Sequence, residues 1–442
     1  MNTSQPAAVS ATAASSSSRN APPSNDPRVV GLASMIGTSI EWYDYFLYGT
    51  AAALIFNKIF FPAFDPLTGT LAAFATYAVG FFARPFGGLI FGHFGDKIGR
   101  KKMLLLSLIL MGVPTILIGL IPSYEQIGYW AAVLLVLMRI IQGIAVGGEW
   151  GGAVLMAVEH APKGKKGFFG SLPQAGMAPG LVVSSLAMAA VARLPEEDML
   201  SWGWRIPFLA SVVLLVVGYF IRVRVHESPD FEHMKAHGKE VAVPAAEVLR
   251  HHRRPLLTVI GARFAEVTWF YTVATFSLTY ATTSLGLEKA VILEAVIVGA
   301  GVAFFTIPLV GMLADRVGQR RIFMLGGLLL GLYSPLYFAL LDSRDAALIA
   351  LAVTIAIAGV QALLYSPEAG LFSAQFPPEV RYSGISLGVQ VSGAIGGGIA
   401  PVMAIYLLDL GGGKPTYVIA YLIALGVVAL GSAMAMRSPY QH

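Results

Sequence analysis

The sequence predicts an all-α membrane protein with twelve transmembrane helices in two pseudo-symmetric six-helix bundles. The chain of 442 residues is 56% hydrophobic and only 12% charged, and its mean hydropathy is +0.69, which is too apolar for a soluble domain. It contains twelve apolar runs of about twenty residues, the length that crosses a bilayer as a helix. One loop motif also occurs twice, about half a chain apart, which indicates an internal duplication.

The apolar runs are predicted as helices because a lipid-exposed backbone must satisfy its hydrogen bonds internally. The first six build an N-terminal bundle over residues 28–223, and the last six build a C-terminal bundle over residues 256–437. Residues 224–255 are polar and basic and form the expected cytoplasmic linker. The runs cover residues 30–53, 70–93, 103–121, 127–149, 168–192, 205–223, 256–283, 290–313, 322–341, 346–373, 382–408 and 415–436.

Orientation follows from the 30 lysines and arginines, most of which lie in the N-terminal tail, the even-numbered loops and the C-terminus. Both termini are therefore expected in the cytoplasm, as in a multi-pass protein of the inner (plasma) membrane. Residues 1–27 are rich in Ala, Ser, Asn and Pro and lack the apolar core of a cleaved signal peptide. We expect them to form a disordered cytoplasmic tail. The same asymmetry explains the net charge of +5 without any nucleic-acid partner.

The repeated motif reads GHFGDKIGRKK at Gly92–Lys102 and GMLADRVGQRR at Gly311–Arg321. At this offset Gln142 corresponds to Gln361, Glu149 to Glu368 and Asp44 to Arg263.

The motif has the chemistry of a gate. Asp96 and Asp315 are expected at cytoplasmic helix ends, where a carboxylate can pair with Arg100, Arg321 or a neighbouring helix terminus and hold that side closed. The alternative is a basic loop that only fixes the topology.

Five ionisable residues interrupt long apolar stretches: Arg84, Arg139, Arg263, Asp44 and Glu149. A charged side chain costs several kcal/mol in hydrocarbon, so it persists where it faces a partner, a water-filled cavity or a ligand. We expect functional groups among these five.

The acids are candidates for proton coupling. Asp44 is the first choice, and the alternative is an acid permanently paired with an arginine. Glu41 lies one turn away on the same face, although it could be only a hydrated surface group. Glu149 is a second proton site or, equally, a packing or gating acid among glycines.

The basic residues are candidates for binding a small anionic substrate. Arg139 is expected near mid-membrane with Gln142 at i+3, and its planar guanidinium suits a carboxylate. Arg84 and Arg263 add positive potential, but Arg84 precedes Pro85 and could serve packing. Arg263 and Glu266 could also pair with each other.

Aromatic side chains complete the predicted pocket. Tyr45 accompanies the acids of the first helix, and Tyr271, Trp269 and Tyr280 offer aromatic surface in the seventh. Packing is the more usual role of such residues.

Other classes of function find no support. The sequence has no cysteine and no nucleotide-binding glycine loop, and no helix spaces its histidines as zinc ligands. It also lacks a convincing catalytic set, so we expect neither an enzyme nor a metal or cofactor, and the proton gradient is the expected energy source.

Several segments resemble one family. The double loop motif is similar to that of the major facilitator superfamily. IEWYDYFLYG (Ile40–Gly49), ARPFGG (Ala83–Gly88), RIIQGIAVGGEWGGA (Arg139–Ala153), WGWRIPF (Trp202–Phe208), HESPDFE (His226–Glu232), RYSGISLG and GGGIAP (both within Arg381–Pro401) resemble its metabolite:proton symporter family. Helix 7 looks nearest to shikimate-transporting members.

The resemblance implies a monomeric transporter that imports a small carboxylate with protons by alternating access. It also implies that Glu159 joins the gate, whereas its counterpart in the second half is Ala374. The gate of the second half is therefore expected to be weaker or to use Glu368 or Glu379 instead. An exchanger or exporter of organic acids, a symporter of a zwitterion such as betaine or proline, and a sensor that does not transport are the alternatives.

Overall fold

The computed structural model describes residues 26–238 and 241–437, and these residues form helices and no strand. Their bounds are α1 Pro27–Ala51, η1 Ala52–Phe56, α2 Asn57–Phe60, α3 Pro66–Ile98, α4 Arg100–Leu120, α5 Tyr124–Ile127, α6 Tyr129–Glu159, α7 Lys166–Ala175, α8 Met177–Val191, α9 Glu196–Asp198, η2 Met199–Gly203, α10 Arg205–Arg224, α11 Pro229–Ala236, α12 Pro244–His251, α13 Arg253–Tyr271, η3 Thr272–Phe276, α14 Ser277–Thr283, α15 Lys289–Val317, α16 Gln319–Asp342, α17 Ala346–Thr354, η4 Ile355–Gln361, α18 Ala362–Ser373, η5 Pro378–Val380, α19 Arg381–Leu410 and α20 Thr416–Ala435.

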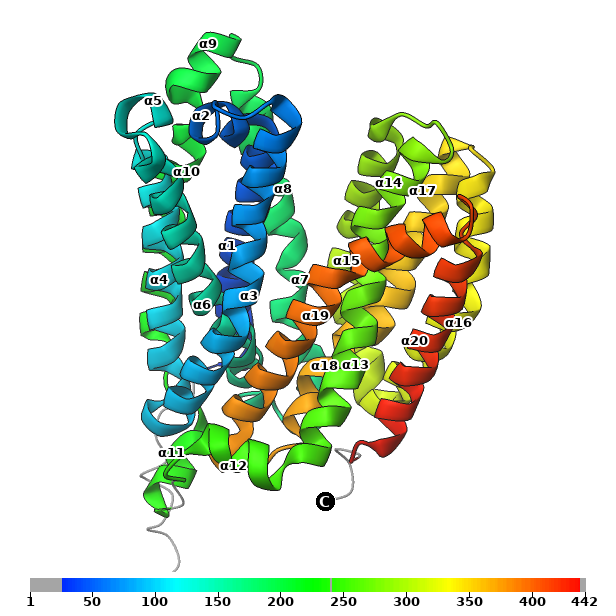
Figure 1. Ribbon diagram of the computed structural model, residues 1–442. Helices are drawn as coiled ribbons and strands as arrows, with labels where there is room; N and C mark the ends of the chain where they lie inside the picture. Colours follow the sequence, from blue (N-terminus) through cyan, green and yellow to red (C-terminus); the bar gives the residue numbers. More distant parts are fainter. Residues whose placement is uncertain (1–25, 239–240, 438–442) are drawn as a thin grey trace, which may run out of the picture.

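The long helices form two bundles (Figure 1). The N-terminal half contains α1, α3, α4, α6, α7 with α8, and α10, and the C-terminal half contains α13 with α14, α15, α16, α17 with α18, α19 and α20. The halves meet at the end where α11 and α12 lie and diverge toward the end that carries α2, α5, α9 and α14 (Figure 1). The predicted all-α fold of two six-helix bundles is confirmed.

Ten helices of the described region are long and apolar enough to cross a membrane. The other two predicted spans correspond to α1 and to the continuous segment α13–η3–α14, which run alongside the ten in the bundles (Figure 1). Both carry charged residues in mid-helix, Glu41 and Asp44 in one and Arg263 and Glu266 in the other. These two spans therefore add two charged residues each to those, Arg84 and Arg139, that α3 and α6 bring to the centre of the molecule.

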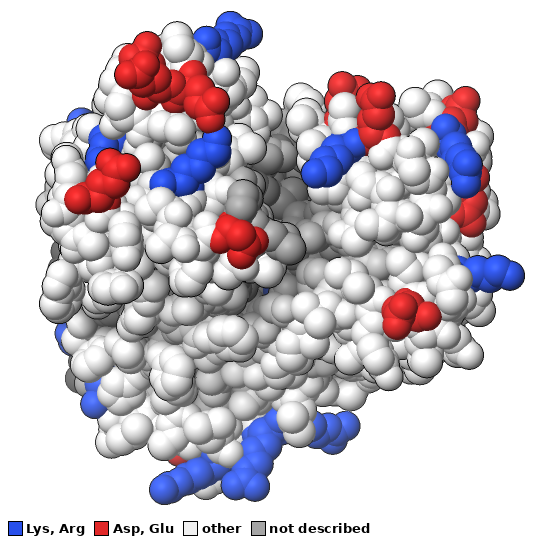
Figure 2. Space-filling view, turned by 45° about the horizontal axis from the view of Figure 1, so that its top comes forward, with Lys and Arg blue, Asp and Glu red and all other residues white. Residues whose placement is uncertain are grey.

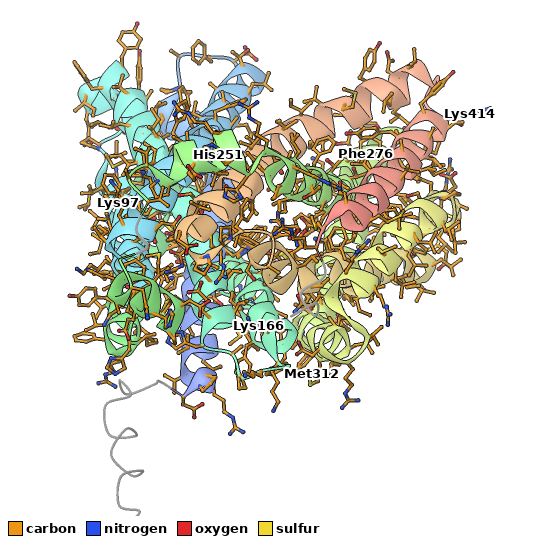
Figure 3. The ribbon with its side chains drawn as sticks, turned by 90° about the horizontal axis from the view of Figure 1, so that it is seen from below. Lys97, Lys166, His251, Phe276, Met312 and Lys414 are labelled. Carbon is orange, nitrogen blue, oxygen red and sulfur yellow. The ribbon has the colours of Figure 1, made fainter. Side chains whose placement is uncertain are left out.

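Two short helices, α11 and α12, occupy the segment predicted as the linker. Helix α12 contacts α3 of the first half and both α13 and α19 of the second. Seen from this side, His251 of α12 lies across the junction of the halves, and Lys166 of α7 lies near Met312 of α15 (Figure 3). The tail predicted over residues 1–27 falls almost entirely outside the described residues, and α1 already begins at Pro27.

Glycines of the repeated motif allow the halves to approach closely at this end. A Cβ atom on Gly92 would lie 2.7 Å from the Cα atom of Ser383, and one on Gly311 would lie 2.7 Å from the carbonyl oxygen of Gly167. Both contacts join one half to the other, α3 to α19 and α15 to α7. Larger side chains would push the backbones apart.

The opposite end is open. Figure 2 shows a hollow between the two halves, with both acidic and basic residues around the open end and a group of lysines and arginines at the opposite edge of the molecule.

Candidate functional site

Two adjoining cavities occupy the centre of the molecule. The larger, with an empty volume of about 670 Å³, is lined by both halves, and the smaller, of about 350 Å³, lies within the N-terminal half. They share Glu41, Arg84 and Val146. We call them the central cavity and the N-terminal cavity. Apart from the shared residues, the polar and charged side chains of their walls are Asp44, Tyr45, Arg139, Gln142, Arg263, Glu266, Tyr271, Gln361, Tyr365 and Gln390.

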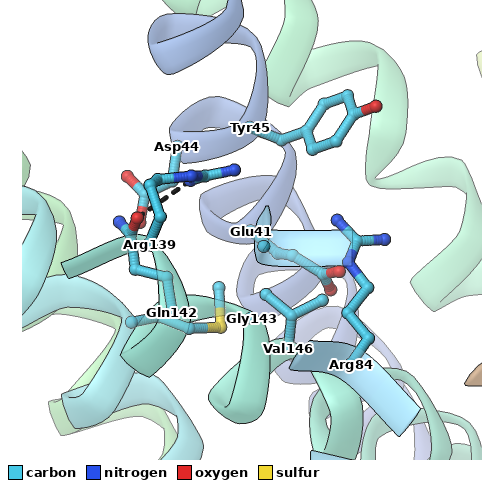
Figure 4. A pocket seen from close by; sticks show the side chains of 10 residues that line it. Glu41, Asp44, Tyr45, Arg84, Arg139, Gln142, Gly143 and Val146 are labelled. Atoms are coloured by element: carbon cyan, nitrogen blue, oxygen red, sulfur yellow. Dashed lines mark hydrogen bonds between the residues drawn. The ribbon is translucent and has the colours of Figure 1, made fainter. Parts of the chain in front are cut away.

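Arg139 of α6 reaches into the N-terminal cavity as an unpaired cation. Its side chain is buried, with 5% exposed, and its Nη1 donates to Gln142 Oε1 at 2.8 Å (Figure 4). The guanidinium also lies 4.0 Å from the ring centre of Tyr48. No carboxylate among the described residues forms an ion pair with it, and its Nε has no hydrogen-bond partner in that part of the chain. A buried guanidinium of this kind can accept an anionic ligand.

Asp44 of α1 faces Arg139 through neutral groups. Its Oδ2 accepts a hydrogen bond of 2.8 Å from Thr115 Oγ1, which in turn accepts one of 2.7 Å from Gln142 Nε2. Asp44 Oδ1 has no partner among the described residues, and the side chain is buried. The carboxylate is therefore not held in the permanent ion pair that was the alternative to proton exchange.

Thr115 is a member of this network that sequence reasoning missed. The signal available was a hydroxyl residue directly after Pro114 in the apolar second half of α4.

Glu41 and Arg84 stand where the two cavities meet. Both point into the same space in Figure 4, and neither forms an ion pair among the described residues. The Arg84 guanidinium lies 4.2 Å from the ring centre of Phe81 and 5.5 Å from that of Tyr45. Arg84 therefore combines the two roles that the sequence offered. It lines both cavities, and it packs against aromatic rings.

Arg263 of α13, in contrast, is already neutralised. Its Nη1 lies 2.8 Å from Glu266 Oε2 and 2.6 Å from Glu368 Oε2. The pairing of Arg263 with Glu266 was the alternative to substrate binding, and it is present here. Gln361 Nε2 donates to Glu266 Oε1. Glu368, considered in the sequence as the counterpart of Glu149 and as a gate acid of the second half, is instead the additional partner of Arg263.

Aromatic side chains close the central cavity on its open side. The hydroxyl groups of Tyr45 and Tyr271 are hydrogen-bonded at 2.9 Å and so link α1 to α13. The rings of Phe81 and Tyr271 make an edge contact with centres 6.3 Å apart.

The other two aromatic candidates of helix 7 do not line either cavity. Trp269 is buried against Tyr337, and the Tyr280 hydroxyl donates to Asp342 at 2.6 Å. Both pack within the C-terminal half because their faces of the helix point away from the first half.

Glu149 lines neither of the two cavities. It forms an ion pair with Arg222 of α10 and accepts a hydrogen bond of 2.5 Å from Ser107. Arg222 Nη1 also donates to the carbonyl oxygen of Leu104 at 2.7 Å. The contacts favour the packing role of this acid. Arg222 was missed because it lies in the last turn of α10, beside the basic linker.

The repeated motif of each half binds the start of a helix in the other half. Asp96 accepts hydrogen bonds from the backbone N–H groups of Tyr382 (3.1 Å) and Ser383 (2.9 Å) at the start of α19. Asp315 accepts them from Gly167 (2.6 Å) and Phe168 (2.9 Å) at the start of α7. Both aspartates therefore bind helix N-termini, which were one kind of partner expected from the sequence. The positive end of the helix dipole lies at each of these sites.

A second layer of charges surrounds Glu159 at the same end. It accepts hydrogen bonds from Arg100 at 3.3 Å and from Arg381 at 2.8 Å, and Arg381 also pairs with Asp230 at 2.6 Å. Ser228 donates to the other oxygen of Glu159. Sequence reasoning missed Arg381, Asp230 and Ser228 as partners, although HESPDFE and RYSGISLG contain them. Arg321 is exposed and donates only a long bond, 3.4 Å, to the Val317 carbonyl.

Comparisons with known proteins agree with this architecture. Residues 29–250 match the family model described as sugar (and other) transporter, and residues 258–441 match that of the major facilitator superfamily. The chain is 41% identical over 415 residues to the shikimate transporter of Escherichia coli (strain K12), covering 93% of this chain and 94% of the relative. It is 33% identical over 420 residues to the proline/betaine transporter of Salmonella typhimurium (strain LT2), covering 92% and 82%.

Solved structures show the same fold at low sequence identity. The proton:xylose symporter bound to 6-bromo-6-deoxy-D-glucose aligns with a TM-score of 0.72 at 16% identity, covering 92% of this chain and 94% of that chain. A variant of the Escherichia coli fucose:proton symporter aligns with a TM-score of 0.69 at 15% identity, covering 92% and 99%. Two bundles, a cavity between them and relatives of this kind identify a membrane transporter and not an enzyme, and the chain belongs to the major facilitator superfamily.

Proposed function

We propose that this protein imports a small organic acid together with protons, by secondary active transport with alternating access. Shikimate and related carboxylates are the candidate substrates. The observation that carries the proposal is the pair formed by Arg139 and Asp44, a buried cation and a buried acid that face one cavity without an ion-pair partner among the described residues.

In this proposal Arg139 receives the substrate carboxylate. A guanidinium offers two parallel N–H donors and keeps its charge, so it binds a carboxylate bidentately. Arg84 adds positive potential at the junction of the two cavities, and Gln142 positions the Arg139 guanidinium. The relative named shikimate transporter supports an organic acid as the substrate.

Asp44 carries the proton. A buried acid whose one oxygen accepts only a neutral Thr115 hydroxyl can exist in both protonation states, because no fixed cation holds it ionised. The Thr115–Gln142–Arg139 chain then connects the protonation of Asp44 with the geometry of the substrate site. The structural relatives named proton symporters are consistent with this energy source.

The orientation follows from the charges. We place the edge rich in lysine and arginine in the cytoplasm, which puts both chain termini there and makes the hollow between the halves face outward. The protein then lies in the bacterial inner membrane as a monomer, in an outward-facing state that the tyrosine bridge of Tyr45 and Tyr271 partly closes.

The test is uptake into proteoliposomes with an imposed pH gradient, acidic outside, using labelled shikimate and then competing aromatic acids, dicarboxylates and citrate. Accumulation of shikimate above equilibrium that a protonophore abolishes is the expected result. Exchange of internal for external acid without any response to the gradient would identify an exchanger, and binding without flux would identify a sensor.

A zwitterion is the second candidate, and a specific observation favours including it. Glu41 borders the central cavity beside Trp42 and Phe270, whose rings make an edge contact with centres 6.4 Å apart. An acid beside aromatic rings suits an alkylated ammonium group, and some relatives are named proline/betaine transporters. Glycine betaine and proline therefore belong in the competition screen, and inhibition by betaine but not by shikimate would replace the acid as the substrate.

A further inference from the structure

The C-terminal half contains one buried cation with two buried acids. Arg263 Nη1 lies 2.8 Å from Glu266 Oε2 and 2.6 Å from Glu368 Oε2. The Glu368 side chain is fully buried, and that of Glu266 is 3% exposed. We call Arg263, Glu266 and Glu368 the C-terminal triad.

The charges of the triad do not cancel if both acids are ionised. One guanidinium and two carboxylates leave a buried negative charge, which is costly in a low-dielectric environment. Within residues 26–238 and 241–437, the one neutral donor to either acid is the amide of Gln361, which donates to Glu266. Glu368 Oε1 has no hydrogen-bond partner among the described residues. When two carboxylates share one site, a single bound proton removes the excess charge.

Among the described residues no second cation forms an ion pair with Glu266 or Glu368. Tyr365 lies beside Arg263, with its ring centre 5.0 Å from the guanidinium, and Trp150 of the other half is 5.3 Å away. Glu41 and Arg84, one acid and one base, face the triad across the central cavity. Helix α6, which packs against α18, carries Arg139 in the N-terminal cavity and Glu149 in its ion pair with Arg222. The helices α7, α15, α16, α19 and α20, also packed against α13 or α18, carry their charged residues near their ends or carry none.

The triad is connected both to the cavity and to the moving interface. Arg263 and Glu266 line the central cavity, whereas Glu368 lies behind them. Helix α18, which carries Glu368, packs directly on α7 of the first half, where a Cβ atom on Gly170 would lie 2.7 Å from that of Ala369. A proton can therefore reach Glu266 from the cavity, and a change in how the halves pack alters the environment of Glu368.

We propose that Glu266 and Glu368 hold one exchangeable proton between them beside Arg263, as a proton-binding site separate from Asp44. The bound form contains one carboxylic acid, one carboxylate and one guanidinium and is neutral. The proton leaves as H⁺ when the cavity opens on the cytoplasmic side and water solvates the second carboxylate. The transport role rests on the proposed function, in which the triad adds a second proton per substrate.

Infrared difference spectroscopy tests the site without any substrate. Purified protein in lipid is titrated from alkaline to acidic pH, and the carbonyl band of protonated carboxyl groups is compared between variants. Glu368→Gln and Glu266→Gln should each lose one band component, because either change leaves a one-to-one ion pair that needs no proton. Glu149→Gln is the matched control, since Glu149 already pairs one-to-one with Arg222. A parental band that keeps every component in both triad variants would overturn the proposal.

The number of protons transported per substrate tests whether the proton of the triad takes part in transport. With the membrane potential held at zero and a gradient of about one pH unit, loss of one coupled proton lowers the steady-state accumulation of shikimate about tenfold. Glu368→Gln should show this loss and still accumulate shikimate. If Glu368→Gln loses the infrared band but keeps the parental accumulation ratio, the proton of the triad is structural and is not transported. That result would overturn the coupling role. No gradient-driven uptake by the unmodified protein would instead refute the proposed function, and the infrared result would stand independently.

Discussion

The two halves of the molecule use their buried charges in opposite ways. In the N-terminal half, Arg139 and Asp44 are separated by the neutral Thr115 and Gln142. In the C-terminal half, Arg263 contacts two carboxylates directly. The duplicated glutamine serves the opposite charge in each half, because Gln142 accepts from an arginine whereas Gln361 donates to Glu266.

This difference shows how a duplicated scaffold can divide one task. The first half leaves a guanidinium unsatisfied and so has affinity for an anion. The second half leaves a carboxylate in excess and so has affinity for a proton. Substitutions that make the buried charges of the two halves alike should therefore abolish either substrate binding or proton coupling. Each of these losses can be measured.

The largest expected effect is the loss of coupling through Asp44 in Asp44→Asn. The variant keeps the Thr115 hydrogen bond but can no longer release a proton, so the accumulation ratio should fall about tenfold for each pH unit of the imposed gradient. Exchange of labelled for unlabelled substrate across the membrane should remain, because the binding site is intact. Gradient-driven accumulation at the parental level would remove Asp44 from the mechanism.

The second effect is on stability, and it distinguishes Arg263 from Arg139. Arg263→Gln leaves two buried acids without a cation and should lower the free energy of unfolding by about 3–5 kcal/mol, as expected when one partner of a buried ion pair is removed. Arg139→Gln should lower it much less, because no carboxylate depends on Arg139 for an ion pair.

Thermal unfolding of the purified variants at neutral pH measures this difference. Adding Glu368→Gln to Arg263→Gln should restore part of the lost stability, since it removes one of the unpaired acids. Equal losses for the two arginine variants would break the proposed contrast between the halves.

A third effect concerns recognition of the anion. Arg139→Lys keeps the charge but loses the planar pair of donors, so the apparent KM should rise by about 10- to 100-fold. Competition by the amide or ester of the substrate provides the control. If the variant distinguishes acid from amide as well as the parent does, the carboxylate is held elsewhere and Arg84 becomes the next candidate.

The smallest effect is expected at the closed end. Asp96→Asn weakens two charge-assisted hydrogen bonds to α19, and a loss of about 0.5 kcal/mol per bond corresponds to about a fivefold increase in cytoplasmic opening. The chain has no cysteine, so Gly393→Cys in the cavity wall gives a unique site for a thiol reagent applied from that side. Asp315→Asn should act similarly, because it holds α7 in the same way. Labelling at the parental rate in both variants would show that these bonds do not hold the gate.

The fold was predictable because the features that specify it extend over long continuous segments of the sequence. Apolar runs and a repeated loop motif are properties of single segments, so the helices and the duplication could be recognised without knowing which helices touch. The two spans with the lowest hydropathy, α1 and α13–η3–α14, were also recognisable, because each still contains a long run around its charges.

The partners of the charged residues were not predictable to the same degree. Thr115 meets Asp44 from another helix, and Arg222 meets Glu149 from a position beside the linker. Such contacts depend on the relative depth and rotation of helices distant in the sequence, and a shift of one turn changes every partner. The pairing of Arg263 with Glu266 could be foreseen because it is local, at i+3, whereas the contact with Glu368 comes from another helix.

The hydroxyl bridge between Tyr45 and Tyr271 has a consequence for the rates of the cycle. On the outer side one neutral hydrogen bond and a few ring contacts separate the cavity from solvent, and side-chain rotations of this kind are fast compared with domain motions. On the inner side the halves are joined by two aspartates at helix N-termini and by the ion pairs around Glu159. External ligand should therefore enter and leave many times before the molecule turns over once. Binding from outside would then approach equilibrium, and the slow event in each turnover would be the parting of the cytoplasmic contacts.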